Sequence, residues 1–332
     1  MLKVLKVVLK IVLVPVVAVL AVWCGLALWY QFPGSEILRN ILIAGIALTG
    51  LATMVALFTA KAKRFLTLFA VAFAAVALWW NTIEAPSEGN WAPDVSRQVT
   101  GEFDGDLVTL TNVREFGWRT KEDFDAHWTT RTFDLSKLET LDVFMSYWSN
   151  QYIAHILVSF GFSDGEHVVW SVEVRRRTDS GYSPVADFFK EHTLVTVASV
   201  EQDIAGLRTN IREEDVQLYR TNIPPSAARG LFEQYVSYSN ELAEEAKWYN
   251  SIFTNCTTVI YFLLESAGIH NAFDWRILVN GYLPEYFYDR GIVQTGLPID
   301  ELRELGRIAP KAKEIGLTPA YYDAVRVGVP TP

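Results

Sequence analysis

The sequence predicts a mixed α+β protein in which three membrane-spanning helices precede an antiparallel-sheet domain. Three long apolar runs near the N-terminus predict the spans, because a helix needs about 20 residues to cross the bilayer core. Short segments with alternating apolar and polar residues then predict strands. Two apolar helical patterns in the second half of the chain predict helices that pack on one side of the sheet.

The membrane spans are expected at residues 11–30, 41–60 and 65–83. Basic residues precede the first span and lie between the second and third, which predicts a cytoplasmic N-terminus and a periplasmic C-terminal part in a bacterial inner membrane. The predicted organisation is a membrane anchor at residues 1–83, a linker rich in proline, glycine and serine at 84–100, and a periplasmic catalytic domain at 101–332.

Charge is distributed unevenly along the chain. Residues 1–81 contain seven Lys or Arg and one Glu, a net charge of +6, while the whole chain has −9, which leaves −15 for residues 82–332. So acidic an exported domain lacks the basic surface that nucleic-acid binding requires. Because no metal-ligand spacing and no glycine-rich phosphate loop is present, we expect neither a metal nor another cofactor.

The most distinct strand pair is a predicted β-hairpin. Residues 152–160 and 167–175 are rich in β-branched and aromatic residues and flank an Asp-Gly turn. His155 is expected in the middle of the first strand. A two-residue turn would place it opposite Val174, whereas a three-residue loop or a bulge would place it opposite Glu173.

The remaining pattern completes the sheet domain. Further strands are expected at residues 107–113, 123–135, 140–145, 188–199 and 216–219. A long amphipathic helix is expected over residues 225–247, and a short one over 299–305.

The stretch from Trp248 to Glu265 contains the candidate nucleophile. Cys256 is the only cysteine outside the predicted spans, and Asn255 before it is a favourable N-cap residue. An apolar run follows, which predicts that Cys256 lies in the first turn of a buried helix. There, backbone N–H groups and the helix dipole stabilise a thiolate. The alternative is a small apolar residue in the core.

A nucleophilic thiolate requires a base and a group that orients the base. Among the five histidines, only His155 lies inside a strongly predicted strand, so it is the candidate base. Glu173 is the candidate orienting group, and Ser171 is an alternative. A Cys at a helix N-terminus packed against a His on a sheet is the arrangement of papain-like folds, here with a permuted His-before-Cys order.

Several stretches, in this order, resemble the Lnb-type N-terminal periplasmic domain family of bacteria. AHILVSFGFSDG contains His155, SVEVRR contains Glu173 and WYNSIFTNCTT contains Cys256. The other matching stretches are YSPVADFF, SVEQDIAGLRTN, LPIDELRELGR and AVRVGVP, so the resemblance covers about residues 100–332.

The resemblance implies a Cys–His thiol acyltransferase at the outer face of the inner membrane. Such an enzyme N-acylates lipoproteins and uses a membrane phospholipid as acyl donor, with Cys256 as nucleophile and His155 as its base. In the family's named acyltransferase the membrane helices follow the periplasmic domain, whereas here three precede it.

The expected partners are therefore a phospholipid donor, a lipoprotein acceptor and the membrane itself. Asn255, Trp248 and Tyr249 are candidate substrate contacts along an acyl groove, with core packing as the alternative for the two aromatic residues. Arg208 is a candidate ligand for a phosphate or carboxylate, with a structural ion pair as the alternative. Two other functions stay open: a cysteine peptidase or amidase that acts on envelope peptides, and a non-enzymatic envelope scaffold.

Overall fold

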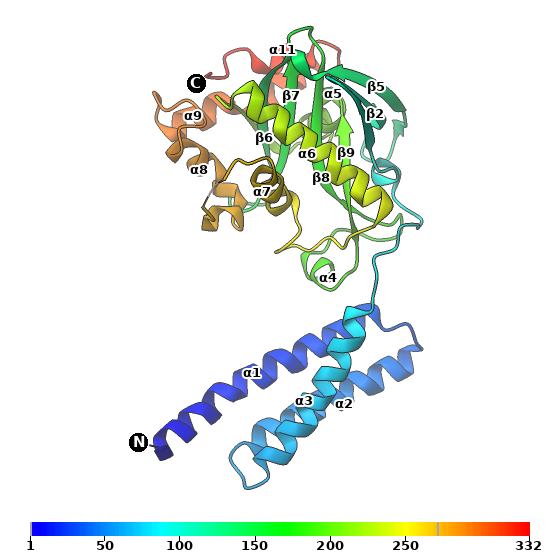
Figure 1. Cartoon of the computed structure of the whole chain (residues 1–332), viewed down its shortest axis with the longest axis vertical. Coiled ribbons are helices and arrows are strands. Elements are labelled where there is room, and N and C mark those ends of the chain that lie inside the picture. Colours follow the sequence, from blue (N-terminus) through cyan, green and yellow to red (C-terminus); the bar gives the residue numbers. More distant parts are fainter. Residues whose placement is uncertain (1, 271) are drawn as a thin grey trace. The chain divides into compact units, whose positions relative to one another are not determined.

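The computed structural model describes residues 2–270 and 272–332 (Figure 1). The chain forms two compact units. One contains the residues up to Pro86 together with Ser183–Glu191, and the other contains Ser87–Tyr182 and His192–Pro332. Ala92, Val95 and Val99 are buried in the second unit. The exposed segment that connects the two units is therefore shorter than the linker predicted at residues 84–100.

Three long apolar helices form most of the first unit: α1 (Leu2–Gln31), α2 (Glu36–Ala56) and α3 (Ala62–Asn81). Each is long and apolar enough to cross a membrane, in agreement with the three predicted spans. Helix α2 begins five residues earlier than predicted. The hydroxyl of Ser35 accepts a hydrogen bond from the Leu38 N–H at 3.4 Å, which caps the helix there.

Residues 183–191 also belong to the first unit, although the sequence placed them in the exported domain. Helix α4 (Pro184–Phe188) ends where the strand predicted at 188–199 was to begin, and the observed strand starts only at Thr193, so the prediction is wrong for residues 188–192. Ser183 caps the helix and Pro184 favours its first turn, while Lys190 adopts a positive φ of 61° that interrupts an extended chain. Phe189 stacks on Tyr30 with 5.8 Å between ring centroids.

The second unit is built on one sheet with the strand order β1-β2-β9-β8-β7-β6-β10, in which β5 pairs with β2. Its strands are β1 (Thr100–Asp104), β2 (Leu107–Arg114), β5 (Trp128–Asp134), β6 (Leu138–Tyr147), β7 (His155–Phe162), β8 (His167–Arg175), β9 (Thr193–Ser199) and β10 (Asp215–Arg220). Every pairing is antiparallel except β2 with β9. The short strands β3 (Gly117–Trp118) and β4 (Phe124–Asp125) pair separately, so the strand predicted at 123–135 is in fact two strands.

The β7–β8 hairpin determines what faces His155. The Phe162 N–H donates to the Glu166 carbonyl at 2.9 Å, and Gly165 has a φ of +86°, so the loop contains three residues. Leu157 lies opposite Ser171, and the same register continued by two residues places His155 opposite Glu173. Of the two alternatives, the three-residue loop is confirmed.

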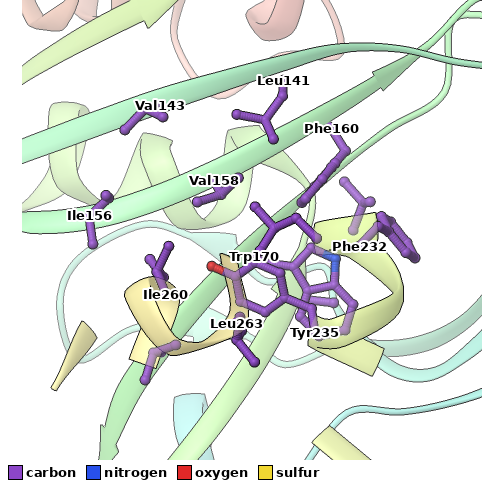
Figure 2. Close-up of a cluster of buried hydrophobic side chains, with 14 of the residues drawn as sticks. Leu141, Val143, Ile156, Val158, Phe160, Trp170, Phe232, Tyr235, Ile260 and Leu263 are labelled. Carbon is purple, nitrogen blue, oxygen red and sulfur yellow. The ribbon is translucent and has the colours of Figure 1, made fainter. Parts of the chain in front are cut away.

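Helices cover both faces of the sheet, so the prediction of helices on one side is wrong. Helices α6 (Pro225–Glu244) and α7 (Cys256–Ser266) bury one face, where Trp170 of β8 stacks on Tyr235 (Figure 2). Helices α5 (Glu201–Gly206), α10 (Ala309–Ile315) and α11 (Tyr321–Arg326) bury the other. Helices α10 and α11 span two turns or fewer, and α5 passes directly into a π-helical turn (Leu207–Ile211), so a regular 3.6-residue apolar period does not develop in these segments. Helices α8 (Leu283–Asp289) and α9 (Ile299–Gly306) lie between α7 and α10 in the chain.

Candidate active site

Cys256 is the first residue of α7, which confirms the predicted helix start. The backbone N–H groups of Thr257 and Thr258 donate to Asn255 Oδ1 at 2.9 and 3.0 Å. The Thr258 hydroxyl accepts from the Asn255 N–H at 2.9 Å, which completes a reciprocal capping box. Gly268, with a φ of +77°, follows the end of the helix. The sulfur therefore lies at the positive end of the α7 dipole.

His155 is the first residue of β7 rather than a central one. Its Nε2 lies 2.8 Å from Ser171 Oγ and 3.1 Å from Glu173 Oε1, and the Ser171 hydroxyl donates to the same carboxylate oxygen at 2.7 Å. Cys256 lines the same cavity as His155 and lies close enough for the charge of His155 to lower the pKa of its thiol. Because Nε2 faces Ser171 and Glu173, Nδ1 is the nitrogen left for Cys256. The structure thus brings Cys256, His155 and Glu173 together, and their catalytic roles stay predictions.

Arg208 is held by carboxylates of the protein itself. Its Nη2 donates to Glu173 Oε1 at 3.0 Å and its Nη1 to Glu214 Oε2 at 3.3 Å, and the Ser146 hydroxyl donates to the same Glu214 oxygen. The guanidinium is buried, with 6% of its side chain exposed. This pairing favours the structural alternative for Arg208, and its binding of a substrate anion stays a prediction.

The electrostatics of the site favour a thiolate beside an imidazolium. Burial raises the pKa of the Cys256 thiol, but the hydrogen bond and positive charge of His155 outweigh it and lower that pKa. Burial and the charge of Arg208 act to lower the pKa of His155, but Glu173 and the hydrogen bond with Cys256 raise it to about 9. Burial acts to raise the pKa of Glu173, but the charges of His155 and Arg208 hold it well below its usual range.

Asn280, which the sequence did not single out, connects the two sides of the site. Its Oδ1 accepts from the Ala154 N–H at 2.8 Å, and its Nδ2 donates to the Ala154 carbonyl at 2.6 Å and to Thr257 Oγ1 at 2.7 Å. Nδ2 lies 3.9 Å from the sulfur of Cys256. Because Ala154 precedes His155 and Thr257 follows Cys256, this one side chain connects the two candidate catalytic residues. These bonds also replace strand pairing at Ala154, which is why β7 begins at His155.

A cavity of about 730 Å³ opens over the site, a volume typical of sites for organic ligands. Its walls include Cys256, His155 and Glu173, together with Asn255 and Tyr249. Trp248 is not one of its lining residues, and the Trp248 backbone instead bridges to Thr193. Six basic side chains also line it: Arg114, Lys121, Arg176, Arg177, Arg208 and Arg212. Within residues 2–270 and 272–332, no group of three or more His, Cys, Asp or Glu side chains could hold a metal ion.

The part of the chain that holds this site is similar to a known protein family. Residues 124–281 match the family model of the Lnb N-terminal periplasmic domain. This part of the chain is similar to an Lnb-type domain. The match contains Cys256, His155 and Asn280, and it confirms the resemblance noted in the sequence. Searches of curated proteins and of solved structures found no significant match. Together with three apolar helices, the Lnb-type domain makes this a membrane-associated protein with a periplasmic domain.

The charge of Glu173 can be tested apart from its shape. Glu173→Gln keeps an acceptor for Ser171 but removes the negative charge that raises the pKa of His155. We expect the pKa of His155 to fall, that of Cys256 to rise, and alkylation of Cys256 by iodoacetamide at pH 7 to slow by about tenfold. The measurement uses the full chain with Cys24→Ala in both proteins. An alkylation rate equal to that of the parent would contradict the assignment of Glu173.

The His155–Glu173 pair also makes the stability of the Lnb-type domain depend on pH. His155 has a pKa raised from 6.5 to about 9, so its contribution is complete below pH 6.5 and is lost as the pH rises towards 9. Glu173 has a lowered pKa, so its contribution is present above 4.5 and is lost as the pH falls below that value. The pair should therefore contribute most between pH 4.5 and 6.5. Urea unfolding of the wild type and of His155→Gln should differ most in that window and converge above pH 9.

Replacing Asn280 tests its role as a link within the Lnb-type domain. Asn280→Ala removes three hydrogen bonds and leaves the buried polar groups of Ala154 without these partners, which we expect to destabilise the domain by about 1–3 kcal/mol. Alkylation of Cys256 should slow as well, because His155 is no longer held against the thiol. The matched control is Asn222→Ala, whose exposed side chain donates to the Gly291 carbonyl. Equal effects of the two substitutions on unfolding and alkylation would refute the role of Asn280.

Proposed function

We propose that the protein is a membrane-anchored thiol acyltransferase at the outer face of a bacterial inner membrane, with its N-terminus in the cytoplasm. It would move an acyl chain from a phospholipid to the amine of a lipoprotein. The observation that carries the proposal is the Cys256–His155 pair, whose shifted pKa values favour a thiolate and an imidazolium at the wall of a large cavity. The Lnb-type domain and the three apolar helices support the choice of substrates.

In the first half-reaction, the Cys256 thiolate attacks the ester carbonyl carbon of the phospholipid. The His155 imidazolium gives its proton to the departing alcohol oxygen, so lysophospholipid leaves and a thioester remains. Asn255 already occupies the N–H groups of Thr257 and Thr258, so the donor from this turn to the oxyanion would be the N–H of Cys256 itself.

In the second half-reaction, the amine attacks the thioester carbonyl. Neutral His155 accepts a proton from the amine, and the thiolate leaves, which restores the starting pair and yields an amide. Glu173 and Ser171 keep the imidazole oriented through both steps.

Intact mass spectrometry tests the proposal. The full chain is incubated with phospholipid vesicles, alongside Cys256→Ser. We expect a fatty-acyl mass on the wild type that hydroxylamine removes, and none on the variant. Absence of the adduct while the thiol still reacts with alkylating reagents would overturn acyl transfer from phospholipid and favour peptide hydrolysis. An inert thiol would instead favour the scaffold.

A further inference from the structure

Most exposed large apolar side chains of the second unit belong to segments that line the Cys256 cavity or that contact such a segment. They lie in four short segments, residues 148–153, residues 252–253, residue 262 and residues 273–278, which we call the aromatic rim. Its most exposed members are Phe253, at 65%, and Phe273, at 62%. A soluble surface rarely keeps so many large apolar groups in water without a partner.

The segments of the rim are connected to one another and to the cavity. Trp148, Ile153 and Leu278 are rim residues that also line the cavity with Cys256. The rings of Tyr152 and Trp275 both contact Tyr282, with centroid separations of 6.0 and 5.4 Å.

The other side of the rim is joined in the same way. The ring of Tyr261 contacts both Phe262 and Phe273, with centroid separations of 5.7 and 6.4 Å. Residues 252 and 253 belong to the loop that leads into the cap of α7, where both backbone N–H groups donate to Asn250. The apolar surface is therefore continuous with the walls around the thiol.

The rim is neutral in a strongly acidic part of the chain. Residues 248–264 and 143–154 contain no charged side chain, although residues 82–332 have a net charge of −15. In the segment 273–278 the only charges are Asp274 and Arg276, and Arg276 donates to both oxygens of Asp274 at 2.9 Å. A neutral surface approaches anionic head groups without the repulsion that the rest of the domain experiences.

We propose that the aromatic rim docks on the outer leaflet of the membrane and admits a lipid acyl chain directly into the cavity. Three apolar helices of the same chain are long enough to anchor it in that membrane. Only residues 82–91 lie between the end of α3 and the buried Ala92, and a fully extended chain of that length spans at most about 35 Å. Trp, Tyr and Phe side chains are the ones that favour the head-group region. Docking itself does not require catalysis. Only the transfer of the bound lipid's acyl group to Cys256 depends on the proposed function.

Photocrosslinking in pure lipid vesicles tests the docking. Benzoylphenylalanine replaces Phe253, Phe262 or Phe273 in the full chain, and Phe103 of β1, which is exposed but lies outside the aromatic rim, serves as the matched control. We expect crosslinks to labelled phospholipid at the three rim positions, at least fivefold above those at Phe103. Equal yields at all four positions would overturn the proposal. A crosslinked dimer in place of lipid adducts would overturn it in favour of a second copy.

A second readout separates docking from chemistry. Phe253→Ser and Phe273→Ser should slow acylation of Cys256 by vesicle lipid at least fivefold, while its acylation by a water-soluble short-chain ester stays within twofold of wild type. Slowing of both reactions alike would contradict the docking role. Lipid crosslinks without any acylation of Cys256 would leave the docking intact and refute the acyl transfer. Acylation by the soluble ester without lipid crosslinks would leave the thiol chemistry intact and refute the docking.

Discussion

Cys256→Ser is expected to reduce acyl transfer by on the order of 10³-fold or more. A serine hydroxyl at this position keeps the shape of the side chain, but neutral serine is a far weaker nucleophile than a thiolate paired with an imidazolium. The substitution should leave the fold intact, because the thiol packs at the first turn of a helix whose cap is made by Asn255 and Thr258. The measurement is the release of lysophospholipid from vesicles by the full chain.

Cys24→Ser is the matched control for this loss. Cys24 is the other cysteine of the chain and lies within α1, in the anchor, so its replacement should leave the rate within about twofold of wild type. A Cys256→Ser protein that is folded and still releases lysophospholipid at the wild-type rate would remove Cys256 from the mechanism.

Arg326→Ala is expected to destabilise the second unit by about 3–5 kcal/mol. Arg326 lies in α11, and its guanidinium pairs with Asp142 of β6 and with both oxygens of Glu201 in α5 at 2.6–2.9 Å. All three side chains are at most 7% exposed. Removing the Arg326 cation would leave the buried carboxylates of Asp142 and Glu201 without this partner. A buried charge that loses its partner costs far more free energy than the packing lost with the side chain.

The measurement is thermal unfolding of the full chain in detergent, in which we expect the transition of the second unit to fall by roughly 10 °C. The control is Arg307→Ala. Arg307 also pairs with two carboxylates, Asp215 and Glu304, but its side chain is 44% exposed, so the loss should stay below about 1 kcal/mol. If both substitutions lowered the transition equally, burial of the Arg326 cluster would not be the source of its stability.

The local parts of the site could be predicted because their signals are local. An Asn before an apolar run predicts a capped helix, and the cap of α7 is present with Cys256 in its first turn. The same is true of the hairpin, whose Asp-Gly turn limited the register to two alternatives. The choice between them depended on the backbone of Gly165, which only the structure shows.

The remaining features depend on contacts between distant segments. Asn280 meets Ala154 across 126 residues, and Arg326 meets Asp142 across 184, so neither pairing leaves a pattern in the sequence. Helix α4 was missed because its five residues are too few for a helical period to appear in the sequence. The aromatic rim was missed for a different reason. Its segments appear in the sequence as ordinary apolar residues, and only the fold leaves them exposed.

The most direct test of the central claim, that His155 activates Cys256, is the rate of Cys256 alkylation by iodoacetamide between pH 4 and 10. The full chain carries Cys24→Ala and is compared with the same protein carrying His155→Gln. We expect the wild-type thiol to react at lower pH than an ordinary cysteine and His155→Gln to shift its titration upwards, because burial then raises the pKa of the thiol without the opposing charge of the imidazolium. A wild-type thiol that reacts only above pH 9, or a titration that His155→Gln leaves unchanged, would contradict it.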